Sequence, residues 1–204
     1  MEPVEDEVDV SANRLDGQNL TNNVIDNVYY NVGDDGYDDS DGSIVISKTT
    51  NMGDISNAEP GSEDVKSKFN GVILKVAAGT GTITVNVKTS GNAQLVVQVG
   101  NDTPMMASKT EKGDVMFSYN VTENTYVYIY AIIGSSYARN TRSGSDDAVK
   151  IYGIKVAPGA SGIIDTKREV TGNNEYYTLD GRKLDALPTK KGIYLVNGKK
   201  TVVK

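Results

Sequence analysis

Hydrophobic and polar residues alternate strictly along three segments in the middle of the chain. In 82–88, Ile83, Val85 and Val87 alternate with polar residues, and the segments 72–76 and 94–99 repeat the pattern. A period of two is typical of an antiparallel strand that buries one face. The pattern predicts a core that includes Leu74, Val76, Ile83, Val85, Val87, Leu95, Val97, Ile129 and Ile151.

Further segments have the composition of strands, namely 24–32, 43–48, 115–119, 126–133 and 149–156. In the last of these the alternation changes phase near Gly153, which predicts a β-bulge. A single helical turn is expected at 63–68. Eight or so short strands without a long amphipathic helix predict an all-β protein. We expect an antiparallel β-sandwich of jelly-roll-like topology, followed by a small β module.

The chain of 204 residues has room for one ordinary domain and a small appendage. We expect a polar lead-in at 1–23, either irregular or with a short strand near 8–10, and the sandwich at 24–158. A linker at 156–162 then leads to a C-terminal module at 163–204. Acidic residues follow Met1 at once, so we interpret the start as internal to a longer protein, without a signal peptide.

Composition restricts the chemistry of the chain. It has no Cys and no His, which excludes a thiol nucleophile, a disulfide and a Ser-His-Asp triad. We therefore expect no enzymatic activity and no cofactor, while a carboxylate-based glycan hydrolase or lyase stays open as an alternative. The net charge of −6 argues against a nucleic-acid partner, and no run of eighteen apolar residues is present to span a membrane. We expect a monomer.

Charge is unevenly distributed along the chain. Residues 1–64 carry a net −14, and residues 65–204 carry a net +8. The acidic part contains a loop at 33–42 that is rich in aspartate, which predicts either a solvated turn or an irregular calcium site. The spacing does not fit an EF-hand, because Tyr37 and Lys48 occupy ligand positions of that motif. The candidate calcium ligands are Asp34, Asp35, Asp38, Asp39 and Asp41.

Three tyrosines, Tyr126, Tyr128 and Tyr130, fall on one face of a predicted strand, opposite aliphatic residues. They are the candidate ligand-binding residues, because a row of exposed aromatic rings stacks well on sugars. The alternative is that the rings pack beneath a loop or a neighbouring element.

The last thirty residues contain two turn signals. Asp180-Gly181 follows a short aromatic strand at 176–179, and Asn197-Gly198 joins two hydrophobic runs into a predicted hairpin. The segment resembles the C-terminal sorting domains of Bacteroidetes surface and secreted proteins, which carry a tail of the type IX secretion kind. The matching residues are Tyr177, Gly181, Arg182, Leu184, Lys191, Gly192, Ile193, Tyr194, Asn197, Gly198, Lys199, Lys200 and Lys204.

This resemblance implies an export address rather than a reaction. The sandwich is more loosely similar to modules of leucine-rich-repeat surface proteins, through 28–33, 125–130 and 150–156. We therefore expect a secreted or surface-exposed, non-enzymatic interaction module, adhesin-like, within a larger exported protein. A carbohydrate-binding module of a glycan-degrading system is the alternative, and the partner is a glycan or a host or surface protein.

Overall fold

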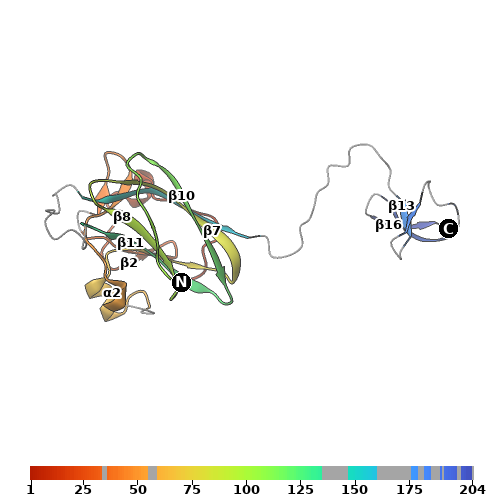
Figure 1. Ribbon diagram of the computed structural model, residues 1–204, viewed down its shortest axis with the longest axis horizontal. Helices are drawn as coiled ribbons and strands as arrows, with labels where there is room; N and C mark the ends of the chain where they lie inside the picture. The colour runs from red at the N-terminus through yellow and green to blue at the C-terminus, as the bar shows by residue number, and fades with distance from the viewer. Residues whose placement is uncertain are drawn as a thin grey trace. The chain divides into compact units, whose positions relative to one another are not determined.

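The computed structural model describes residues 1–33, 36–54, 59–134, 147–159, 176–178, 182–184, 189, 191–196 and 199–203. The chain divides into two compact units, Met1–Gly162 and Ile163–Lys204. Strands dominate both units (Figure 1). The linker expected at 156–162 is described only as far as residue 159.

The first unit contains two antiparallel sheets of six strands each, which form two layers in Figure 1. Sheet A has the order β10-β7-β12-β5-β4, with β1 beside β12. Its strands are β1 (Glu7–Val8), β4 (Tyr37–Asp38), β5 (Ser43–Ile46), β7 (Gly79–Thr89), β10 (Gly113–Val121) and β12 (Val149–Pro158). Sheet B has the order β2-β3-β6-β11-β8-β9. Its strands are β2 (Asn23–Ile25), β3 (Val28–Asn31), β6 (Gly71–Val76), β8 (Gln94–Val99), β9 (Met105–Ala107) and β11 (Thr125–Ile132).

The order of eight of these strands is that of a jelly roll. The four strands β5-β12-β7-β10 of sheet A face β6-β11-β8-β9 of sheet B. Along the chain, successive strands cross from one sheet to the other, except that β8 and β9 are neighbours in sheet B. Two interlocked Greek keys of this kind define the jelly roll. The fold class predicted from the sequence is therefore confirmed.

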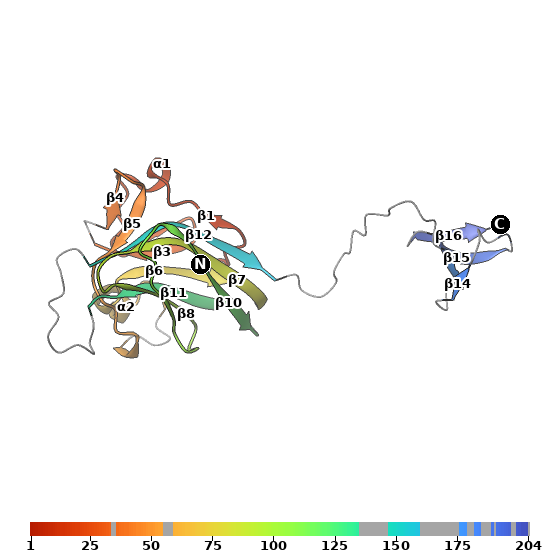
Figure 2. The ribbon, with the colours of Figure 1, turned by 45° about the horizontal axis from the view of Figure 1, so that its top comes forward.

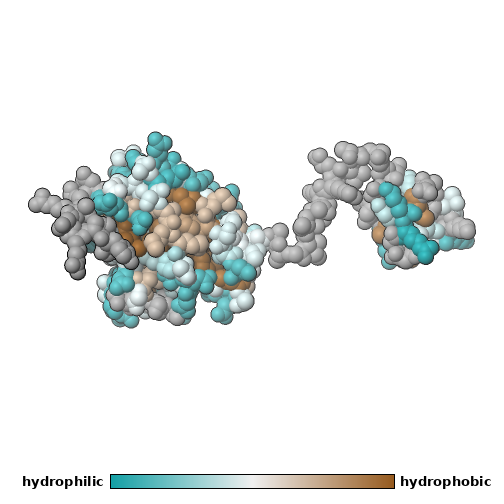
Figure 3. Space-filling view, in the orientation of Figure 1, coloured by the Kyte–Doolittle hydropathy of each residue, from teal (hydrophilic) through white to brown (hydrophobic). Residues whose placement is uncertain are grey.

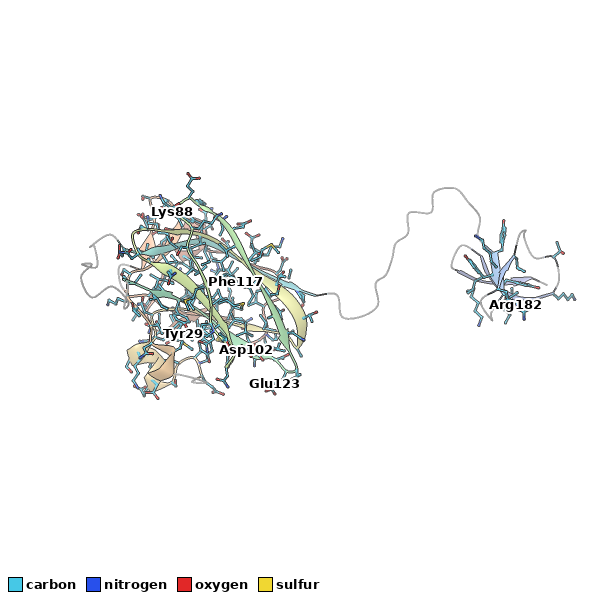
Figure 4. The ribbon with its side chains drawn as sticks, in the orientation of Figure 1. Tyr29, Lys88, Asp102, Phe117, Glu123 and Arg182 are labelled. Carbon is cyan, nitrogen blue, oxygen red and sulfur yellow. The ribbon has the colours of Figure 1, made fainter. Side chains whose placement is uncertain are left out.

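The main core lies between the two sheets and follows the predicted alternation. All nine core residues predicted from the sequence belong to it and are fully buried. Phe117 of β10 also lies between the layers, whereas Lys88 of β7 points away from them (Figure 4). The predicted bulge is present as well, because the register of β12 against β7 shifts between Ile151 and Gly153.

Two predictions for the N-terminal part were wrong. The single strand expected at 24–32 is a hairpin of β2 and β3, whose turn residues Asp26 and Asn27 both have positive φ. Such a pair closes a two-residue hairpin turn, because its twist matches that of the strands. The lead-in is part of the sandwich, since it contributes β1 and the short helix α1 (Ala12–Leu15) and buries Val8, Val10, Leu15 and Leu20. Figure 2 shows α1 near β4 and β5.

The helix α2 (Glu63–Lys68) confirms the helical turn predicted from the sequence and lies on the outer side of sheet B (Figure 1). A short 3-10 helix, η1 (Met52–Asp54), precedes it. Ser62 caps the N-terminus of α2, with its hydroxyl accepting from the backbone N–H of Val65. At the other end, the amide of Asn31 donates to the carbonyls of Val65, Lys66 and Phe69. Both ends of this short helix are therefore satisfied, and Val65 is buried against the sheet.

The second unit is a four-stranded antiparallel sheet, sheet C, in the order β14-β13-β15-β16. Its strands are β13 (Tyr176–Thr178), β14 (Lys183–Leu184), β15 (Gly192–Val196) and β16 (Lys199–Val203). The final hairpin predicted from the sequence is present as β15 and β16, although its turn at 197–198 lies outside the described residues. Ile193 and Val202 face each other across this hairpin and remain largely exposed.

Candidate ligand-binding groove

The predicted row of tyrosines does not form an exposed platform. Tyr128 and Tyr130 are 1% and 3% exposed, and Tyr126 is half-buried. Their rings lie on the outer face of sheet B, as predicted, but α2 and η1 cover that face. Phe69 packs edge-on against Tyr128 and Tyr130, with ring centroids 6.1 and 6.4 Å apart. The ligand-binding role predicted for these tyrosines is therefore wrong in this structure.

The covered tyrosines form a second apolar cluster of the first unit. Its buried members are Tyr29, Met52, Val65, Phe69, Ile73, Val96, Tyr128 and Tyr130. Figure 4 shows Tyr29 on the side of the sandwich where α2 lies. Burial raises the pKa of Tyr29, Tyr128 and Tyr130 to about 12, so the hydroxyls stay protonated. That of Tyr130 donates to Oε1 of Gln98 at 3.3 Å.

The aspartates of the predicted calcium loop hold a lysine. Nζ of Lys150, on β12, lies 2.6 Å from Oδ2 of Asp38 and 2.9 Å from Oδ2 of Asp41. Asp39 is exposed, and Asp34 and Asp35 lie outside the described residues. Within the described part of the chain, no three or more acidic side chains are arranged to hold a metal ion. The ammonium of Lys150 thus supplies the positive charge that the calcium prediction assigned to a metal.

The pKa values of this cluster follow from its hydrogen bonds. Hydrogen bonds from Lys150 and from the hydroxyl of Ser40 lower the pKa of Asp38 to about 2. Burial acts to raise the pKa of Asp41, but hydrogen bonds from Ser43 and Lys150 outweigh it, so the pKa of Asp41 is also lowered. The same contacts raise the pKa of Lys150 above its ordinary value. All three groups are charged at neutral pH.

An open groove lies on the outer face of sheet A, where β12 bulges. Asn86 of β7 is paired with Asp114 of β10 on one side and with Gly153 of β12 on the other. Because Gly153 has no side chain, the surface is hollowed above it. The groove has a volume of about 370 Å³ and is lined by Glu7, Thr84, Asn86, Lys112, Asp114, Tyr152, Gly153, Ile154 and Lys155.

Tyr152 provides the aromatic wall of the groove and is held at both its edge and its face. Its hydroxyl donates to Oδ2 of Asp41 at 3.2 Å, so the cluster around Lys150 fixes the outer end of the ring. Burial, together with the charge of Asp41, raises the pKa of Tyr152, which keeps the hydroxyl protonated as a donor. Nζ of Lys112 lies 3.8 Å from the ring centroid, in a cation–π contact.

Asn86 provides the polar floor. Its amide nitrogen donates to Oδ1 of Asp114 at 2.5 Å. Its Oδ1 is covered by protein atoms and has no hydrogen-bond partner among the described residues. Leaving a covered acceptor unpaired costs free energy of about 1–3 kcal/mol. A ligand that donated a hydrogen bond here would recover part of that cost, provided that a flexible side chain lining the groove moved aside.

The groove residues were not singled out in the sequence. Tyr152, Asn86 and Lys112 are far apart along the chain, and none belongs to a recognisable motif. The one local signal was the change of phase near Gly153, which predicted the bulge but not the groove that it opens.

The surface of the first unit is otherwise largely polar, with hydrophobic residues gathered in limited areas of the face in Figure 3. Its exposed large apolar side chains, among the described residues, are Val24, Met106 and Met116. No helix in the described part of the chain is both long and apolar enough to cross a membrane. No protein-family model matches the chain, and no curated protein matches its sequence significantly.

Proposed function

We propose that the first unit is a non-enzymatic binding module that takes a segment of a glycan chain in the groove of sheet A. The observation that carries this proposal is the pairing of a fixed tyrosine ring with a floor of amide, carboxylate and hydroxyl groups. Sugar rings present an apolar face and a rim of hydroxyls, and such a site offers a partner to each.

The dimensions of the groove support a small polar ligand. Its volume of about 370 Å³ is at the lower end of the range for ligand sites. Thr84 and Asp114 supply acceptors, Lys155 supplies a donor, and Asn86 supplies an unpaired acceptor at the floor. This mixture suits a ligand with many hydroxyls better than an apolar one, whose burial would leave these groups unpaired.

The positions of the two carboxylates in the groove favour binding over hydrolysis. Glu7 lies on β1 and Asp114 on β10, and the strands β12 and β7 separate them. Three strand spacings place their backbones about 14 Å apart. The two catalytic carboxyl groups of a glycosidase lie only about 5–9.5 Å apart. Asp114 is also engaged by Asn86, so the pair is poorly suited to share one glycosidic bond.

We further propose that the second unit directs export of the protein, which places the module outside the cell or on its surface. The basis is the resemblance of residues 175–204 to type IX sorting tails. Sheet C supports this reading, because the matching strand residues, including Tyr177, Ile193 and Tyr194, belong to one small antiparallel sheet. Adhesion through a glycan partner would follow from the two proposals together.

The groove is tested by screening the full chain on a glycan array and then measuring affinity by calorimetry. We expect Tyr152→Ala to abolish binding of whichever glycan is found, since the stacking wall is lost. Tyr126→Ala is the matched control, because it removes a half-buried tyrosine from sheet B and should leave affinity unchanged. If Tyr152→Ala binds as tightly as the unaltered chain, the groove is not the site.

The export proposal is tested by deleting residues 176–204 in the organism that makes the protein. The shortened protein should accumulate inside the cell. Normal levels at the surface or in the medium would show that this segment is not a sorting signal.

A further inference from the structure

The charges on the outer face of sheet A divide into a committed and an uncommitted set. Lys150 is held by Asp38 and Asp41. Lys112 and Lys155 line the groove, and neither forms an ion pair with any described residue. Both ammonium groups are exposed. The groove therefore carries two lysines whose charges are open to a ligand.

The acidic residues of the groove do not neutralise these lysines. Asp114 accepts from Asn86 at 2.5 Å. Glu7 faces Lys155 across the pairing of β1 with β12, but the two side chains are not within ion-pair distance. A carboxylate brought in by a ligand would meet two free ammonium groups, and it would be repelled chiefly by Glu7 at the edge.

Lys112 has a second property, because it rests on the face of Tyr152. Its Nζ is 3.8 Å from the ring centroid, so a sugar ring that stacks on this face must displace it. A neutral sugar gives the displaced ammonium nothing in return. A sugar with a carboxylate offers it a charged partner, which is a stronger contact than an exposed cation–π pair.

Resting on the proposed function, we infer that Lys112 makes the groove selective for acidic glycans. In the free chain Lys112 occupies the tyrosine face, and in the complex it leaves the face and binds the carboxylate of a uronic acid. Its movement also opens a way for a sugar hydroxyl toward Oδ1 of Asn86. Lys155 reinforces the preference from the opposite wall of the groove.

The test uses the full chain and pairs of oligosaccharides that differ only in charge. The probes are oligomers of galacturonic, glucuronic and mannuronic acid, each beside its carboxyl-reduced counterpart, with affinities measured by calorimetry. We expect the unaltered chain to bind one acidic oligomer roughly threefold to tenfold more tightly than its neutral counterpart, with the difference shrinking as salt is added.

Variants separate the inference from the proposed function. Lys112→Ala should remove most of the acidic preference and bind the neutral counterpart at least as tightly as before, because the competitor for the ring is gone. Lys88→Ala is the control, since Lys88 lies on the same face of sheet A but does not line the groove.

Three outcomes overturn the inference. Tyr152-dependent binding without preference for the acidic oligomers would refute it while leaving the proposed function standing. An acidic preference that survives Lys112→Ala would refute the role of Lys112 alone. If none of the glycans on the array binds at all, the proposed function fails and the inference fails with it.

Discussion

Tyr128 shows how one face of a strand acquires a role that its own sequence does not specify. The ring projects from the outer face of sheet B, where an exposed tyrosine would suit a ligand. Here it meets Phe69, which follows directly after α2 and packs edge-on against it. The ring is fully buried, so its contribution is to stability rather than to recognition.

Tyr128→Ala should therefore lower the free energy of unfolding by roughly 3–5 kcal/mol, as expected for deletion of a buried aromatic side chain. Chemical denaturation measures this change. Tyr126→Ala, at the half-buried end of the same strand face, should cost clearly less. Equal losses for the two variants would contradict the burial seen here.

Tyr152 is the counterpart of Tyr128 on the other sheet. Nothing in its local sequence distinguishes it, but no helix packs over sheet A at this point and the bulge at Gly153 opens the surface beside it. The two tyrosines thus exchange the roles that pattern alone would assign. The difference arises from what covers each face.

Among the elements, α2 depends most on contacts outside itself. It has only six residues, which is too short for a helix to be stable alone. The buried side chain of Asn31, from β3, satisfies three carbonyls at its C-terminal end, with distances of 2.7, 3.2 and 3.4 Å.

Asn31→Ala should therefore leave buried carbonyls unpaired and destabilise the protein by about 1–3 kcal/mol. Amide hydrogen exchange should quicken first in α2 and in the tyrosine cluster beneath it. Lys66→Ala is a suitable control, because its pair with Glu63 is exposed and contributes little. Uniformly faster exchange across sheet A would argue against a local capping role.

The loop between β4 and β5 is tied to β12 by the pairs of Lys150 with Asp38 and Asp41. The pKa of each aspartate is lower in the folded chain than in the unfolded one. A lowered pKa means that the stabilising charge is fully present above about pH 4 and is lost as the pH falls toward 2.

Stability should therefore decline between about pH 4 and pH 2 in the unaltered chain, as followed by thermal unfolding. Lys150→Met should flatten this decline, because the aspartates then lose the partner that lowers their pKa. Asp39→Asn, which changes an exposed aspartate of the same loop, should leave the slope as it is. An unchanged slope in Lys150→Met would show that other carboxyl groups cause the acid sensitivity.

For the whole molecule, the two units differ in how much core each has. Both apolar clusters of the described residues belong to the first unit. The second unit spans about forty residues, and such a small sheet buries little apolar surface of its own.

A chain of residues 1–162 should therefore unfold at the same temperature as the full chain, within about 2 °C. Calorimetry of both proteins measures this directly, and circular dichroism should show the same sheet signal in the shorter one. A drop of more than about 5 °C would mean that the sandwich draws stability from the second unit.

The parts of this protein that local pattern predicted are those governed by local physics. Alternation at 82–88 identified β7 because a strand with one buried face requires a period of two, and the change of phase at Gly153 identified the bulge. The hairpin at 24–32 was missed because Asp26-Asn27 interrupts an apolar run without a glycine. The lead-in was misjudged because its few apolar residues have no period of their own.

The functional residues depended on packing between distant segments. Whether Tyr128 is covered is settled by α2, sixty residues away, and whether Asp38 and Asp41 bind a metal or a lysine is settled by Lys150 on β12. The groove exists because Asn86, Lys112 and Tyr152 come from three strands or their ends, which the jelly-roll order places side by side. Periodicity reports which face of a strand is apolar. It does not report what lies above the other face, and that depends on the tertiary arrangement alone.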